Sequence, residues 1–225
     1  MSFDSPLPPY NASDPSATFV NSSCLELLMI ELVPMAYRIV NEVDAGLDDR
    51  IAISSPEKKD GGSVSGKGSA VGTAGNGTGG VNGRKMDEDE ERDAVFFRLE
   101  MLGYRVGQGL VERFSRDRPR FTDTLDVIKF LCKDLWMLLF RKQIDNLKTN
   151  HRGVYVLTDN SFRPFARMST EPGGNAVVRA QPFLWYPCGI IRGALASMGI
   201  NATVQAETSE LPGATFQIKS ITAKP

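Results

Sequence analysis

MLGYRVGQGLVERF, residues 101–114, combines an apolar helical stripe with three closely spaced glycines. Apolar residues recur at steps of three and four from just before this stretch to its end, which predicts an amphipathic helix over residues 94–114. The stripe consists of Val95, Leu99, Leu102, Val106, Leu110 and Phe114. Because a glycine inside a helix costs up to about 1 kcal/mol relative to alanine, we expect Gly103, Gly107 and Gly109 to allow another backbone to approach closely.

A second apolar stripe lies upstream and predicts a helix that begins at Ser23. Ser23 and Glu26 fit the capping-box pattern, and Pro34 predicts a kink or a break. The stripe consists of Leu25, Leu28, Leu32, Met35 and Ile39. Residues 1–22 are rich in Pro, Ser, Asn and Asp and are predicted to form a disordered arm. Residues 23–225 are then predicted to form a single domain.

That domain is predicted to be interrupted by a low-complexity insertion at about residues 44–93. Ten of the 21 glycines of the chain lie between Asp60 and Arg84, and a segment of this composition has too little apolar surface to offset its conformational entropy. The insertion ends in the acidic run 87–91, DEDEE. We interpret this run as a solvated segment whose last charges favour the positive end of the next helix. The alternative is a functional role, as a site for a metal ion or a partner protein.

Downstream of the quoted stretch, helical and strand-like patterns alternate. A basic link at 115–120 precedes a very apolar helix over 122–147, and a further helix is predicted over 182–198. Period-two alternation predicts four strands, at residues 153–158, 162–168, 200–207 and 214–221. Two hairpins separated by a helix predict an α+β fold, with a helical layer packed on a four-stranded antiparallel sheet.

Composition excludes several classes of function. A formal net charge of −1 argues against a nucleic-acid partner, which needs a basic surface. Cys24, Cys132 and Cys188 lie far apart and suggest neither a disulfide framework nor a zinc site. The one histidine, His151, lies in a polar turn, so we expect no imidazole metal site, no cofactor and no catalytic residue. We also expect no leader and no membrane-spanning segment.

Several blocks of the sequence resemble one family in the right order. The stretch 101–114 is similar to the second-helix signature of the small core subunits of the TRAPP vesicle-tethering complex. Residues 130–136 (FLCKDLW), 142–151 (KQIDNLKTNH) and 153–157 (GVYVL) resemble the subunit-6 branch of that family. The motif of the last helix also matches, at Cys188, Gly189, Arg192 and Gly193.

The resemblance implies a non-catalytic scaffold protein. Family members share the α+β fold described above and pair through their helical faces, and a subunit-6-like chain pairs with a subunit-3-like partner. The assembled complex acts as a guanine-nucleotide exchange factor for a Rab GTPase, in transport from the endoplasmic reticulum to the Golgi and within the Golgi. The chain would thus be cytoplasmic, meeting membranes peripherally and the Rab GTPase only through the whole complex. The acylatable cysteine of subunit-3-like members has no counterpart in the loop 116–120.

Two helices supply the candidate dimer interface, but each of its residues has an alternative place in the core of the chain. The candidates are Leu25, Leu28, Leu32 and Met35 on the first helix, and Val95, Leu99, Leu102, Gly103, Val106, Gly107 and Leu110 on the second. A binding module for an acyl chain or a small lipid, using the apolar helix 122–147, is the alternative function.

Overall fold

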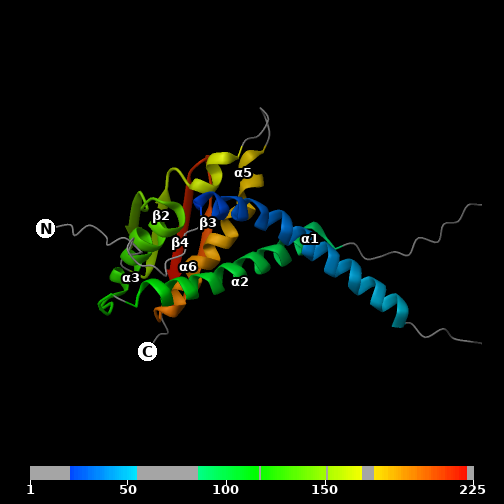
Figure 1. Cartoon of the computed structure of the whole chain (residues 1–225), viewed down its shortest axis with the longest axis horizontal. Helices are drawn as coiled ribbons and strands as arrows, with labels where there is room; N and C mark the ends of the chain where they lie inside the picture. Colours follow the sequence, from blue (N-terminus) through cyan, green and yellow to red (C-terminus); the bar gives the residue numbers. More distant parts are fainter. Residues whose placement is uncertain (1–20, 55–85, 117, 151, 169–174, 222–225) are drawn as a thin grey trace, which may run out of the picture.

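The apolar segments of the chain form a layer of helices and one antiparallel sheet (Figure 1). The computed structural model describes residues 21–54, 86–116, 118–150, 152–168 and 175–221. Most of the predicted arm, residues 55–85 of the predicted insertion, and His151 lie outside these ranges. In the described ranges no helix is long and apolar enough to cross a membrane.

The helical elements are α1 (Ser22–Ser54), α2 (Glu88–Phe114), α3 (Thr124–Phe130), the π-helix η1 (Leu131–Leu135), α4 (Trp136–Phe140), the 3₁₀ helix η2 (Arg163–Arg167), α5 (Ala176–Ala180), the 3₁₀ helix η3 (Gln181–Leu184) and α6 (Trp185–Ser197). The strands are β1 (Asn146–Thr149), β2 (Val154–Asp159), β3 (Ala202–Glu207) and β4 (Ala214–Ser220).

The sheet confirms the α+β prediction. Its order is β1-β2-β4-β3 and every pair is antiparallel, so two hairpins separated by α6 meet at β2 and β4. Leu157, Phe216 and Ile218 are buried on the face covered by helices, whereas alternate residues of β3 are exposed. One face of the sheet is therefore covered and the other meets solvent.

Helix α1 differs from its prediction in its cap, its buried face and its end. Asn21 Oδ1 accepts a hydrogen bond from Ser23 N at 2.9 Å, so Asn21 caps the helix and Ser23 does not. The helix continues unbroken through Pro34 to Ser54. Among residues 21–43, the part of α1 whose burial is described, the buried apolar residues are Met29, Leu32, Val33, Ala36 and Val40. The predicted stripe shares only Leu32 with this set, because the helix buries a face rotated away from that stripe.

Helix α2 begins earlier than predicted, at Glu88, with Asp87 as its N-cap. Four acidic side chains lie in its first turn, Glu88, Asp89, Glu90 and Glu91, where the positive end of the helix favours negative charge. Together with the extension of α1, this shows that residues 44–54 and 88–93, assigned above to the insertion, are helical.

The predicted helix over 122–147 ends at Phe140 and contains a π turn. Arg141 follows in the left-handed region, with φ 60°, and the chain then turns back along the helix. The carbonyl oxygen of Cys132, in the π turn, accepts a hydrogen bond from Ile144 N at 3.1 Å. The strand β1 follows, and its first two residues lie in the segment predicted to be helical.

The strand predicted at 162–168 is wrong, because this segment forms the 3₁₀ helix η2. Pro164 lies in its first turn, and Phe162 and Phe165 both point into the core, three residues apart. Phe162 packs edge-to-face on Phe165, with ring centroids 5.1 Å apart. The spacing of three residues between the two phenylalanines is typical of a 3₁₀ helix, whereas the apparent period-two alternation of this segment predicted a strand.

Candidate protein interface

Glycines set the distance between α2 and α6, which lie side by side (Figure 1). A methyl group added at Gly103 or Gly107 would lie closer than 3.0 Å to the backbone of α6. A methyl group added at Gly189 or Gly193 would meet the backbone of α2 in the same way. Each helix therefore has two glycines, and the main chain of the other helix packs directly against them. Gly109, by contrast, faces open space.

Arg192 locks this helix pair from the side. Its guanidinium forms an ion pair with Glu100 on α2, with Nη2 2.7 Å from Oε2. The same guanidinium lies over the ring of Tyr104, 4.7 Å from its centroid, in cation–π geometry. The motif residues Gly189, Arg192 and Gly193 thus act together against α2.

Five of the candidate interface residues are buried within the chain itself. They are Leu32, Val95, Leu99, Gly103 and Gly107. Burial against the chain's own core removes these residues from a surface that a partner could contact. The sequence could not separate the two roles, since both require an apolar or small residue on the inner half of a helix.

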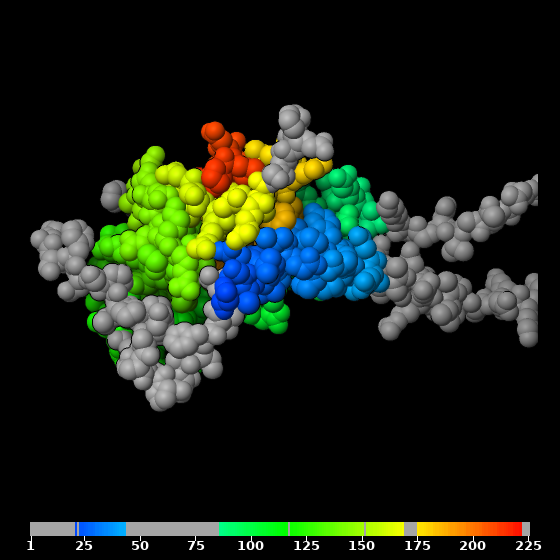
Figure 2. Space-filling view, turned by 45° about the horizontal axis from the view of Figure 1, so that its top comes forward, coloured from blue at the N-terminus to red at the C-terminus, as the bar shows by residue number. Residues whose placement is uncertain are grey.

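Six candidates keep exposed surface on α1 and α2, which pack against each other. Leu28 is 53% exposed. Leu25, Met35, Leu102, Val106 and Leu110 are half-buried, resting on the core with part of each side chain uncovered. These six define what we call the α1–α2 face. Figure 2 shows α1 (blue) as a ridge on the surface of the molecule.

Two further apolar side chains are exposed on the same helices, outside the predicted stripes. Leu27 on α1 and Phe97 on α2 are both 64% exposed. Neither belongs to a helical stripe, so periodicity gave no reason to select them. Each adds a large apolar side chain to the solvent-exposed surface of its helix.

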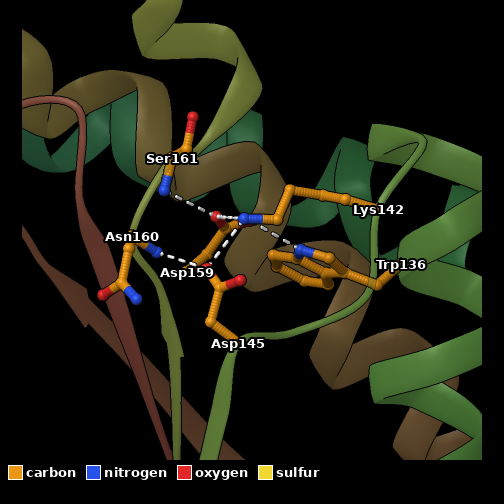
Figure 3. A network of polar contacts seen from close by, with 6 residues as sticks. All are labelled: Trp136, Lys142, Asp145, Asp159, Asn160 and Ser161. Carbon is orange, nitrogen blue, oxygen red and sulfur yellow. Dashed lines mark hydrogen bonds and ion pairs between the residues drawn. The ribbon is translucent and has the colours of Figure 1, made fainter.

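A buried polar network joins the loop after α4 to the end of β2 (Figure 3). Asp159 is fully buried and accepts hydrogen bonds from Trp136 Nε1 at 2.8 Å, Lys142 Nζ at 2.7 Å and Ser161 N at 3.0 Å. Lys142 also contacts Asp145 at 2.7 Å, and its hydrogen bond holds the pKa of Asp145 below the ordinary value. With every charge paired, we interpret this network as structural.

The two buried cysteines, Cys132 and Cys188, do not form a reactive site. Cys132 and Cys188 are buried and Cys24 is exposed, and all three are free thiols. Burial raises the pKa of Cys132 to about 12, and it also raises the pKa of Cys188. Thiols held protonated in this way are poor nucleophiles. Within the described ranges, no group of three His, Cys, Asp or Glu side chains has the arrangement of a metal site.

Comparison with known proteins identifies the family. A model described as "Transport protein particle (TRAPP) component" matches residues 25–221. The chain therefore belongs to the TRAPP component family, as the sequence motifs predicted.

Relatives then place it in the subunit-6 branch. It is 49% identical over 138 residues to trafficking protein particle complex subunit 6b of Danio rerio, covering 61% of this chain and 86% of that protein. It is 51% identical over 128 residues to subunit 6B of Homo sapiens, covering 57% and 80%, and 48% identical over 120 residues to human subunit 6A, covering 53% and 74%.

A solved structure is also similar. It is a subunit 3 of the trafficking protein particle complex from Naegleria fowleri, described as covalently bound to palmitic acid. The TM-score is 0.48 at 16% identity, and the match covers 57% of this chain and 81% of that one.

Proposed function

We propose that this chain is a non-catalytic scaffold subunit of a vesicle-tethering complex, and that it pairs with a subunit-3-like small subunit through the α1–α2 face. The carrying observation is the apolar surface that α1 and α2 leave uncovered. Six partly exposed apolar side chains on two adjacent helices are typical of the core of a protein–protein interface.

The proposed function and location of the chain follow from its membership of the complex. The paired chain takes its place in an assembly that acts as a Rab guanine-nucleotide exchange factor, in transport from the endoplasmic reticulum to the Golgi and within the Golgi. The chain is cytoplasmic and reaches these membranes peripherally, through the complex. It needs no cofactor and no metal.

The alternative function, an acyl-chain site on the apolar segment α3–η1–α4, has less support. Most of the large apolar side chains of this segment are buried in the core, among them Ile128, Phe130, Leu131, Leu135 and Trp136. They contact the chain's own helices and sheet, which leaves little of this helix for a lipid.

The test is co-purification with a subunit-3-like partner from the same organism. A charge placed at Leu28 or Val106 should abolish the pair, because an unpaired charge in an apolar interface is strongly unfavourable. We expect Leu28→Glu and Val106→Glu to elute as separate chains in size-exclusion chromatography with light scattering.

Matched controls keep this test clear. Gln108→Glu adds the same charge at an exposed position of α2 and should leave the pair intact. Leu28 is already half exposed, so Leu28→Glu should also leave the unfolding transition of the isolated chain unchanged. A pair that survives both Glu variants would move the interface to another surface and refute the proposal.

A further inference from the structure

A groove lies between the start of α1, the end of α4 and η2. Leu25 and Met29 line it from α1, Leu139 and Phe140 from α4, and Pro164 from η2. Segments distant in the sequence meet here, and Figure 2 shows the start of α1 (blue) lying against the yellow segment that contains η2. The groove exists because η2 turns where a strand would have run straight, and because the helix stops at Phe140.

The size of the groove favours a side chain over a free small molecule. It encloses about 220 Å³, whereas pockets for small-molecule ligands enclose about 300–1,000 Å³. A single large apolar side chain inserted from a protein surface fits a hollow of this size. Such an anchor, desolvated in a pocket, contributes much of the energy of a protein interface.

The rim of the groove carries an excess of positive charge. Three of the lining residues are arginines, Arg141, Arg163 and Arg167, and Glu26 is the only acidic one. Glu26 is shared, since its Oε1 is 2.5 Å from Arg163 Nη2 and its Oε2 is 3.2 Å from Arg167 Nη2. Arg141 is exposed and makes no ion pair with any residue that the structure describes.

We propose that this groove is a second docking site, which binds a segment of another protein of the complex through a large apolar side chain with carboxylates beside it. The apolar floor takes the side chain, and Arg141, with the unshared donors of Arg163 and Arg167, takes the carboxylates. This goes beyond the pairing function of the α1–α2 face. Leu25 borders both surfaces, so the test does not use it.

The experiment uses an array of overlapping peptides that tile the other TRAPP subunits of the same organism. The full chain is applied alone and paired with its subunit-3-like partner. We expect retained peptides to carry Phe or Leu beside Asp or Glu, and Arg141→Glu to weaken their binding by about tenfold or more. Replacing the peptide carboxylates with lysine one at a time should identify a position at which binding to Arg141→Glu is restored. Arg179→Glu, at an exposed position of α5, makes the same charge change elsewhere and should have no effect.

Other outcomes would overturn the proposal. The groove does not bind acidic segments if peptides bind equally to the wild type and to Arg141→Glu, or if they bind to neither. Peptide binding that is seen only after removal of residues 1–20 would make the chain's own N-terminal segment the occupant. Self-association that Arg141→Glu abolishes would make a second copy of this chain the occupant. Binding of laurate, with no binding of any peptide, would make a small amphiphile the occupant. Loss of pairing in Leu28→Glu, with array binding unchanged, separates this proposal from the pairing function.

Discussion

At the scale of single residues, four glycines decide how closely α2 and α6 approach. The glycine pattern identified the right helix, and the resemblance identified its counterpart, Gly189 and Gly193. The sequence could not show which helix packs against each pair of glycines. Gly103 and Gly107 looked equally suited to another chain and to this one, and only the fold shows that α6 of the same chain fills the space.

Alanine substitutions should separate these glycines from Gly109. Gly103→Ala forces a methyl group into the backbone of α6, and we expect it to lower the free energy of unfolding by about 1–3 kcal/mol or more. Gly109→Ala meets nothing within 4 Å and should raise it by up to about 1 kcal/mol, since alanine is the better helix former. Urea denaturation followed by circular dichroism measures both. Equal effects would mean that the close approach does not limit position 103.

At the scale of elements, the sequence predicted the types better than the ends. The hairpin β3–β4 was placed within two residues, because alternation there is regular and a Pro-Gly turn separates the strands. The strand β1 was missed because residues 146–149, NLKT, follow a helix without a glycine or proline to mark its end. The helix ends at Arg141, which adopts the left-handed conformation. A glycine at this position would have predicted such a helix end, whereas an arginine does not.

The contacts that hold this turn are tertiary, which is why local sequence could not reveal them. Lys142 reaches Asp159, which lies 17 residues further on, and the π turn frees the Cys132 carbonyl for Ile144. The candidate site shows the same limit. Helical periodicity selected apolar residues on two helices, and burial in three dimensions then divided them into core and surface.

Removing the Lys142 ammonium should destabilise the chain. In Lys142→Met, the fully buried Asp159 keeps its bonds to Trp136 and Ser161 but loses its counter-ion. Because Lys142 is partly exposed, we expect a loss of about 1–3 kcal/mol, below the full cost of breaking a buried ion pair. Lys129→Met is the matched control, because Lys129 pairs with Asp126 at the surface and should change stability by less than about 1 kcal/mol. Chemical denaturation that finds the two variants equally stable would contradict a structural role for the network.

At the scale of the whole molecule, α1 packs on the rest of the chain although a long stretch of sequence separates it from α2. Its contacts with α2 and η2, including the ion pairs of Glu26, fix it in place. The predicted insertion is then expected to act as a connection, with α1 held by packing. Loop-closure entropy changes slowly with length, so shortening such a connection has little effect on stability.

Deletion of residues 66–80 tests this expectation. The deletion removes 15 residues of the low-complexity segment, and we expect the free energy of unfolding to change by less than about 1 kcal/mol. Pairing with the subunit-3-like partner should also persist, because no residue of the α1–α2 face is touched. Calorimetry and the co-purification assay measure the two effects. A large loss in either would assign these residues a role in the fold or in the interface.

The contact between α2 and α6 also has a consequence for synthesis on the ribosome. Glu100 and Arg192, which pair across it, lie 92 residues apart in the chain. At about 5–20 residues per second, translation of that interval takes roughly 5–18 s. During this time Gly103 and Gly107 of α2 lack the helix that packs against them. The nascent chain therefore exposes this face of α2 to solvent until α6 has been made.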